Sequence, residues 1–303
     1  MHDIVIRSGK VVDGTGKAIQ QMDIAIDNGL ITAVGNDIGE GRTEIDASNH
    51  LVTPGFVDVH THYDGQATWD PEMSPSSYHG VTTTVFGNCG VGFAPAQPDS
   101  HDWLIQLMEG VEDIPGAALA EGIEWNWETF PEYLDALEKM PRVMDIATQV
   151  PHGSVRAYVM GERGARNEDP TANDLIAMAQ IVQEGIEAGA LGFTSSRTML
   201  HRALDGEPVP VTFAGAEELI AMGKAVADAG GGVVEVASDI GLGGLEGNFG
   251  SDIDWMRALA NDYGLTVTYA LNQADRHPQQ WRELLELSSA PIDCDGKVTA
   301  QVA

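Results

Sequence analysis

The sequence predicts an α/β protein in which a short all-β segment precedes a parallel sheet with helices. Two observations support this fold class. The first 53 residues hold short runs of alternating apolar and polar residues, separated by Gly-containing turns, as in antiparallel strands. From Gly55 onward, runs rich in Val, Ile and Thr alternate with amphipathic stretches of helical period, which is typical of a parallel sheet.

The composition limits the classes of function. A chain of 303 residues, 43% of them hydrophobic, can bury the core of one large domain, or of a large and a small one. It carries 16 Lys and Arg against 46 Asp and Glu, a net charge of −30. Such a surface repels phosphate backbones and anionic lipid, so we expect neither nucleic-acid nor membrane partners. Oligomer formation is left open.

The cysteines and the N-terminus predict a cytoplasmic protein. Cys89 and Cys294 are the two cysteines, too few and too far apart for a disulfide framework, which favours a reducing compartment. The first residues lack the basic and apolar regions of a signal peptide. No apolar run reaches the length of a membrane span.

The all-β segment should consist of short antiparallel strands. Asn28-Gly29 between two alternating runs predicts a two-residue hairpin turn. The expected strands cover residues 4–7, 10–13, 22–26, 30–35, 44–47 and 50–53.

The following part should contain seven strands, linked by helical segments. The expected strands cover residues 55–59, 81–87, 143–150, 190–194, 233–237, 265–271 and 297–302. Helical periodicity covers parts of 99–140 and residues 174–188, 216–229, 252–263 and 278–288. Trp125, Trp127 and Phe130 should pack together rather than line a pocket.

The stretch 51–64 holds the first candidate site. It is expected to form a short buried strand that ends in His60-Thr61-His62. Residues i and i+2 of a strand point to the same side, so both imidazoles should project together. Two converging imidazoles are half of a metal site. The alternative is a pair of solvated loop histidines, which the apolar strand and the Pro54-Gly55 turn make less favourable.

These residues resemble a known family. The stretch 51–64 resembles the first barrel strand of the amidohydrolase superfamily, which ends in His-x-His. The segment "GVTTTVFGNCGVGFAP", residues 80–95, is similar to the N-acyl-D-amino-acid deacylase (D-aminoacylase) branch, in which a cysteine after the second strand is a zinc ligand. "GALGFTSSRTMLHR", residues 189–202, resembles the fourth-strand region of that branch.

The resemblance implies a (β/α)8 TIM-type barrel of the metal-dependent hydrolase kind. Residues 1–53 would be the N-terminal part of a small β-sandwich, and residues 54–303 would be barrel strands one to seven. Seven strands do not close a barrel of eight, and further sandwich strands come from the far C-terminus in this family. We therefore expect a piece of a longer enzyme, inactive on its own.

The resemblance also implies the activity. It is that of a metal-dependent hydrolase of carbon–nitrogen (non-peptide) amide bonds that deacylates N-acyl-D-amino acids, with Zn²⁺ (one or two ions) as cofactor. The metal ligands would be His60, His62 and Cys89; the alternative for Cys89 is a small buried apolar residue. The general-base aspartate of the family follows the eighth strand, beyond the given chain, so the catalytic residue is unassigned.

The sequence departs from the family at two strand ends. The relatives carry zinc-binding histidines after strands five and six, where this chain has Ser238-Asp239 and Asn272-Gln273. An oxygen of Asp239 offers a substitute ligand without support from the family pattern. These changes leave open a cyclic amidase, similar to dihydropyrimidinase or dihydroorotase, or an inactive homologue; Cys89 argues against the cyclic amidase.

Two further residues are candidates for binding a substrate carboxylate. His152 follows the third strand and Arg197 follows the fourth, and a guanidinium can hold a carboxylate bidentately. The alternative for Arg197 is an ion pair with an acidic residue of the protein. His201 and Arg202, in a polar loop, are expected at the surface.

Overall fold

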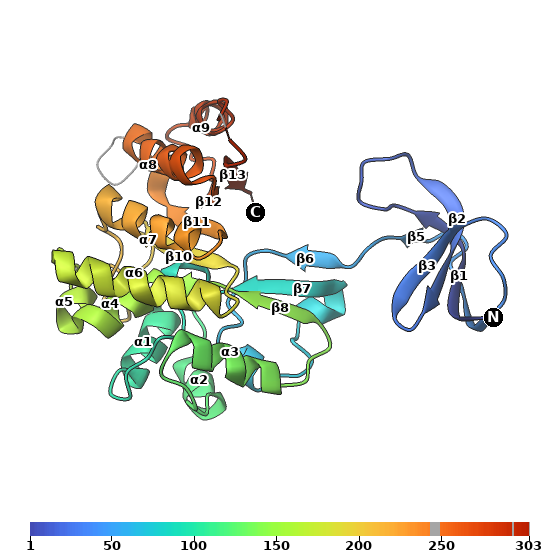
Figure 1. The fold of residues 1–303 in the computed structure, drawn as a ribbon, viewed down its shortest axis with the longest axis horizontal. Helices are drawn as coiled ribbons and strands as arrows, with labels where there is room; N and C mark the ends of the chain where they lie inside the picture. The colour runs from blue at the N-terminus through green and yellow to red at the C-terminus, as the bar shows by residue number, and fades with distance from the viewer. Residues whose placement is uncertain (243–248, 293, 303) are drawn as a thin grey trace. The chain divides into compact units, whose positions relative to one another are not determined.

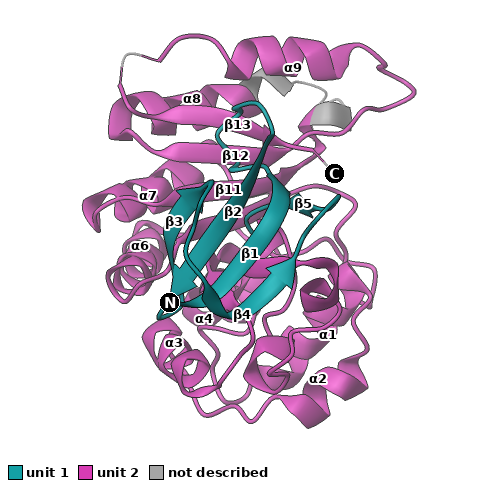
Figure 2. Ribbon diagram, turned by 90° about the vertical axis from the view of Figure 1, so that its right-hand side faces the viewer, with its two compact units in different colours: residues 1–56 teal, residues 57–303 magenta. Residues whose placement is uncertain are grey.

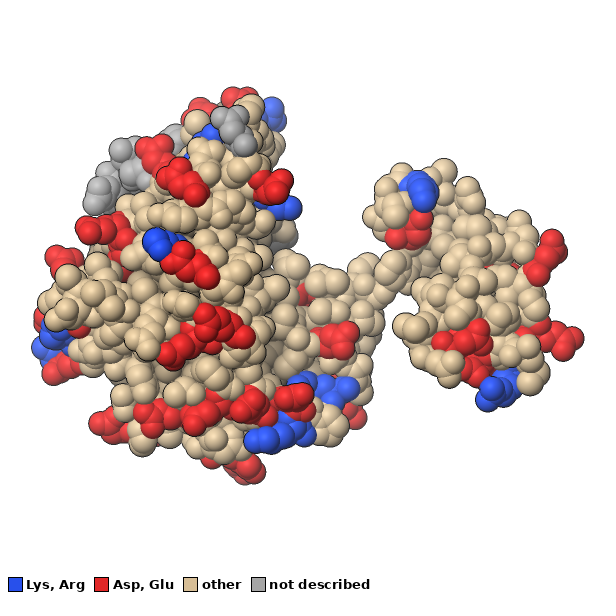
Figure 3. All heavy atoms as spheres, viewed as in Figure 1, with Lys and Arg blue, Asp and Glu red and all other residues tan. Residues whose placement is uncertain are grey.

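The computed structural model describes residues 1–242, 249–292 and 294–302. The chain divides into two compact units, Met1–Phe56 and Val57–Ala303 (Figures 1 and 2). Among the described residues, no helix combines the length and the apolar character needed to cross a membrane. Acidic side chains outnumber basic ones on the face drawn in Figure 3, in keeping with the net charge of −30.

The first unit is a five-stranded sheet (Figure 2). Strands β2 and β3 form the expected hairpin, and its turn residues Asn28 and Gly29 have positive φ angles of 52° and 77°, as a two-residue turn of the primed type requires. Both β4 and β5 pair with β1 in parallel, so the expectation of antiparallel strands throughout is wrong. An alternating pattern marks a strand and its faces but not its partner. The strands are β1 (His2–Val11), β2 (Gln20–Asp27), β3 (Leu30–Gly35), β4 (Gly41–Asp46) and β5 (Leu51–Val52).

The second unit contains the incomplete barrel. Its strands follow in the orders β6-β7-β8 and β9-β10-β11-β12-β13. The pairing of β7 with β8 and the successive pairings from β9 to β13 are parallel. Because only Gln149 separates β8 from β9, these two strands occupy the place of the single third strand that was expected. The strands are β6 (Phe56–Asp58), β7 (Val81–Phe86), β8 (Asp145–Thr148), β9 (Val150–Pro151), β10 (Gly192–Arg197), β11 (Val233–Ser238), β12 (Thr266–Ala270) and β13 (Lys297–Gln301).

Strand β6 differs from the buried strand that was expected. It is three residues long, and Phe56, Val57 and Val59 are 60%, 58% and 52% exposed. In the described part of the chain β6 is the end strand of its sheet, with β7 as its neighbour, so its apolar side chains lack the second neighbour that would cover them. The apolar core lies instead under β10, β11 and β12, where Phe193, Val236 and Val267 are fully buried.

Helices connect the parallel strands, and α6, α7 and α8 pack side by side along the sheet (Figure 1). Each stretch with helical periodicity contains at least one helix. Trp127 and Phe130 pack in the core, where the indole N–H of Trp127 donates to Phe93 O at 2.8 Å. The α-helices are α1 (His101–Glu112), α2 (Gly116–Gly122), α3 (Phe130–Lys139), α4 (His152–Met160), α5 (Glu162–Ala165), α6 (Ala172–Glu187), α7 (Ala216–Asp228), α8 (Phe249–Tyr263) and α9 (Gln280–Ser288).

The N-terminus of α6 is closed by a capping box, whose contribution to stability can be tested by mutation. Thr171 Oγ1 accepts from the backbone N–H of Asp174 at 3.2 Å, and the Asp174 carboxylate accepts from the Thr171 N–H at 2.8 Å. Replacing Thr171 with Ala removes one half of this capping box and should lower the free energy of unfolding by about 1 kcal/mol. Urea denaturation measures the loss. Thr171→Ser keeps a hydroxyl and should remain near the parent; equal losses in both variants would contradict the capping role.

Candidate metal centre

The two predicted histidines follow β6, one on each side of Thr61 in the chain. Between them, Thr61 is tied to β7: its backbone N–H and its hydroxyl both donate to Val85 O, at 2.9 and 2.8 Å. Side chains alternate along an extended segment, so His60 and His62 point to the side opposite the Thr61 side chain. Their rings lie with centroids 5.6 Å apart.

Cys89 follows β7 in a tight turn, Asn88–Gly90. Its own φ is 56°, and the glycines on either side of Asn88-Cys89 have φ angles of 80° and 69°. A non-glycine residue in this region is uncommon and marks a backbone held by its surroundings. The Asn88 side chain supplies part of that hold, because its amide donates to Thr61 O at 3.0 Å and its oxygen accepts from Gln149 Nε2 at 2.9 Å.

His60, His62 and Cys89 converge on one point. The distance from His60 Nε2 to Cys89 Sγ is 3.2 Å, and one potential ligand atom from each residue lies within 4.8 Å of the other two. A sulfur and two imidazole nitrogens are the donor types that zinc prefers. The sequence prediction that these three side chains lie together is therefore met by the geometry.

Two residues orient the His60 ring through contacts with its Nδ1 atom. Its Nδ1 lies 2.9 Å from Gln301 Oε1, on β13, and 3.8 Å from Glu235 Oε1, on β11. Contacts of this kind fix the tautomer of a ligating histidine and leave Nε2 for the metal. The second oxygen of Glu235 accepts from the backbone N–H of Cys89 at 3.2 Å. Sequence reasoning missed Glu235, although a lone carboxylate inside the apolar run of β11 is a readable signal.

The electrostatics of the cluster fit a missing positive charge. Burial raises the pKa of Glu235 to about 8, with a smaller contribution from Glu112, and burial beside Asp113 raises the pKa of Glu112 to about 7. Burial, with His60 and His201 nearby, lowers the pKa of His62 to about 3. Burial and then the neighbouring carboxylates raise the pKa of the Cys89 thiol. A bound cation would oppose the raised pKa values of Glu235, Glu112 and Cys89, and it would further favour the neutral, ligating form of His62.

Unpartnered polar atoms give independent support. His62 Nδ1, Glu112 Oε1 and Glu235 Oε1 are buried without a hydrogen-bond partner. Glu112 Oε1 does lie 3.2 Å from His62 Nε2, but without hydrogen-bond geometry. Buried polar atoms are normally satisfied, so such a group beside a Cys-His-His set fits a metal ion.

The ends of strands five and six do not enter the cluster. Asp239 accepts from the Thr198 hydroxyl and, at 2.8 Å, from the Met199 N–H, so it braces the loop after β10. Asn272 and Gln273 are exposed. Neither end contributes a residue to the groups of potential metal ligands in the described part of the chain.

His152 and Arg197 have partners inside the protein. His152 is fully buried at the start of α4, with Nδ1 2.9 Å from Ser195 Oγ and Nε2 3.0 Å from Glu218 Oε1. Arg197 Nε donates to Asp252 Oδ1 at 2.9 Å, which is the ion pair named as its alternative. Their contact with a substrate stays a prediction.

His201 corrects the sequence analysis. It was expected at the surface, but its ring is half-buried and belongs, with Cys89 and Glu112, to a second group whose potential ligand atoms lie within 4.8 Å of one another. The loop after β10 folds back through an isolated bridge between Arg202 and Pro208. Loop positions carry no periodicity, so the sequence does not reveal this return.

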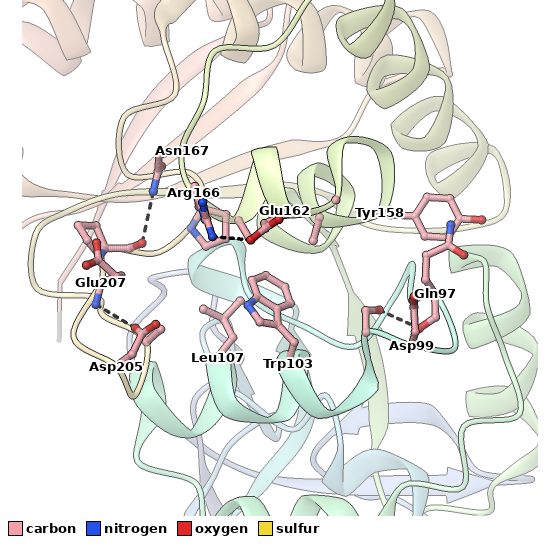
Figure 4. A pocket seen from close by; sticks show the side chains of 17 residues that line it. Gln97, Asp99, Trp103, Leu107, Tyr158, Glu162, Arg166, Asn167, Asp205 and Glu207 are labelled. Atoms are coloured by element: carbon pink, nitrogen blue, oxygen red, sulfur yellow. Dashed lines mark hydrogen bonds and ion pairs between the residues drawn. The ribbon is translucent and has the colours of Figure 1, made fainter.

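Two cavities lie near these elements. One of about 300 Å³ adjoins the cluster and is lined by His62 and Glu112 together with Tyr63 and Gln66. A larger one of about 920 Å³ is lined by α1, α4, α5 and the loop 203–210, with Trp103 and Leu107 of α1 pointing into it (Figure 4). None of the residues that line the larger cavity belongs to the Cys-His cluster, whereas His62 of the cluster lines the smaller one.

Comparison with known proteins gives consistent matches. The Amidohydro_3 amidohydrolase family matches residues 43–300. A D-aminoacylase of Alcaligenes xylosoxydans xylosoxydans is 32% identical over 197 residues, which cover 64% of this chain and 37% of the relative.

Solved structures agree on the fold. A crystal structure of D-aminoacylase superposes with a TM-score of 0.77 at 25% identity, covering 100% of this chain and 58% of the other. N-acyl-D-glutamate deacylase from Bordetella bronchiseptica, complexed with zinc and a phosphonate inhibitor, superposes with a TM-score of 0.74 at 24% identity, covering 99% and 58%. The chain thus spans 58% of these solved proteins and matches 36% to 37% of the curated relatives.

Proposed function

Because the chain belongs to the amidohydrolase family, we propose that it forms part of a metal-dependent hydrolase that deacylates N-acyl-D-amino acids. The observation that carries the proposal is the convergence of His60, His62 and Cys89 beyond β6 and β7. The cysteine favours this activity over a cyclic amidase, because it stands in the segment that resembles the deacylase branch. The names of the relatives, D-aminoacylase and N-acyl-D-glutamate deacylase, point the same way.

In this proposal His60, His62 and Cys89 hold the zinc. Zinc supplies a Lewis acid that polarises an amide carbonyl and eases the deprotonation of water. Gln301 and Glu235 set the His60 tautomer, and Glu235 also holds the turn of Cys89 by accepting its N–H. The general base remains unassigned.

Further assignments belong to the same proposal. Residues 1–53 would be part of a β-sandwich and residues 54–303 part of the barrel, in a cytoplasmic enzyme with a small-molecule substrate. Arg197 would bind the substrate carboxylate by exchanging Asp252 for it, and His152 would assist from the start of α4.

The two cysteines allow a matched test in the full-length protein. Cys89→Ala should lose its zinc and its hydrolysis of N-acetyl-D-amino acids, because the thiolate ligand is gone. Cys294→Ala should retain both, because Cys294 is exposed and lies outside the cluster. Zinc per chain is measured by atomic emission, and released amino acid by a colorimetric assay.

Three outcomes would contradict the proposal. Retention of full zinc content by Cys89→Ala would remove Cys89 from the metal centre. Hydrolysis of hydantoins or dihydropyrimidines in preference to N-acyl-D-amino acids would favour the cyclic amidase. A zinc-loaded protein without activity on either class would support an inactive homologue.

A further inference from the structure

Cys89 belongs to two adjoining groups of potential metal ligands. His60 and His62 form one group with it, and Glu112 and His201 form another, in which one potential ligand atom from each residue again lies within 4.8 Å of the others. The members of the second group come from separate elements: the turn after β7, the end of α1 and the loop after β10.

The surroundings of Glu112 disfavour a negatively charged carboxylate unless a cation lies beside it. It is the last residue of α1, whose last turn contains no basic residue, and Asp113 follows it. The C-terminal end of a helix carries partial negative charge, so an acidic side chain is unfavourable there. The side chain is 19% exposed, and its Oε1 is buried without a hydrogen-bond partner. A cation beside this oxygen would compensate both the helix end and the lost hydration.

His201 is held in an orientation that leaves one nitrogen available. Its Nδ1 forms a hydrogen bond of 2.9 Å with Ser196 Oγ at the end of β10. The loop around it is tied by the Met199 N–H to Asp239 and by the Ala203 N–H to Glu207 O, at 2.8 and 2.9 Å. Such outer contacts preorganise a ligating imidazole, and within the described part of the chain they leave Nε2 without a competing hydrogen-bond partner.

From these contacts we propose that Glu112 and His201 are metal ligands, which bind zinc together with Cys89. A zinc site takes about four donors, or three and a water. The ends of strands five and six supply none, because Asp239 is engaged with the loop and Gln273 is exposed. In this proposal Glu112 supplies an oxygen donor and His201 a nitrogen donor to the zinc that Cys89 binds. This inference rests on the proposed function, since it shares Cys89 with it.

The test compares metal binding among matched variants of the full-length protein. Glu112→Gln and His201→Asn remove one donor each at nearly constant size. Glu121→Gln and His79→Asn make the same changes at exposed positions outside both groups. Zinc per chain is measured after dialysis, the zinc Kd by chelator competition, and the ligand set by the visible spectrum of the Co²⁺-loaded protein.

We expect Glu112→Gln and His201→Asn each to lose half or more of the zinc per chain, or to bind it at least about tenfold more weakly. Their Co²⁺ spectra should keep a thiolate-to-metal band, since Cys89 remains, but change in the d–d region. The Glu121 and His79 variants should match the parent in all three measurements.

Some results would overturn this inference alone. If Cys89→Ala loses zinc while Glu112→Gln and His201→Asn keep the parent's zinc content, Kd and Co²⁺ spectrum, Glu112 and His201 are not ligands although the proposed centre stands. If Cys89→Ala also keeps its zinc, the proposed function fails with it. Thermal unfolding of the metal-free proteins separates ligand loss from misfolding; if Glu112→Gln does not fold, His201→Asn decides the question.

Discussion

Replacing Glu218 with Ala should lower the free energy of unfolding by about 3–5 kcal/mol. Both carboxylate oxygens of Glu218 accept from Arg156 Nη1 at 2.7 Å, and Oε1 also lies 3.0 Å from His152 Nε2. All three residues are at most 3% exposed. Without Glu218, the Arg156 guanidinium would remain buried, with a hydrogen bond to the neutral carbonyl of Glu168, and an uncompensated buried charge is strongly unfavourable.

Glu217 provides the matched control for this experiment. It precedes Glu218 in the first turn of α7 but is exposed, so Glu217→Ala should change the free energy of unfolding by about 0.5 kcal/mol or less. Urea denaturation of both variants measures the difference. Equal destabilisation would show that the buried ion pair contributes nothing beyond the loss of an acidic residue at a helix start.

The same network predicts an acid-sensitive fold. Burial alone would raise the pKa of Glu218, but the hydrogen bond and charge of His152 and the charge of Arg156 outweigh it, so the pKa lies below its usual 4.5. A carboxyl group with a lower pKa in the folded state stabilises the fold above the unfolded-state pKa. This contribution disappears as the pH falls through the folded-state value. Glu218→Gln should therefore lose less stability than the parent as the pH falls below about 4.5.

The sequence predicted the strands of the second unit well, because a parallel strand buried on both faces reads as an apolar, β-branched run. Both β11 and β12 lie within one or two residues of their expected bounds. Helix α4 was missed, since Gly153 near its start lowers the helix propensity and Pro151 reads as a loop residue. His152 does follow the third strand, as expected, but it is also the first residue of this helix.

The sequence likewise predicts some residues of the candidate site and not others. His60, His62 and Cys89 stand directly after strands, where the period of two and the common edge of a parallel sheet give both side and position. Glu112 ends a helix and His201 lies in a loop. Their approach to Cys89 depends on how α1 and the folded-back loop pack, which no local pattern in the sequence encodes.

The turn that carries Cys89 should tolerate an added methyl group poorly at Gly87. Gly87 precedes Asn88–Gly90 with a φ of 80°, and a Cβ there would lie 2.4 Å from Gln149 O and 3.0 Å from Gln149 N. These are backbone atoms of the neighbouring strand region, fixed by the bond from the Gln149 N–H to Phe86 O at 3.1 Å. An alanine must therefore move the turn, and Cys89 with it.

We expect Gly87→Ala to cost about 1–2 kcal/mol for the left-handed backbone and about 1–3 kcal/mol more for the overlap, and to lose zinc. Gly264 has a φ of 69° and open space around its Cβ position, so Gly264→Ala carries the backbone cost alone and should keep its zinc. Urea denaturation and zinc analysis of the two variants separate these effects. If both lose the same stability and Gly87→Ala keeps its zinc, the contact with Gln149 does not position the Cys89 turn.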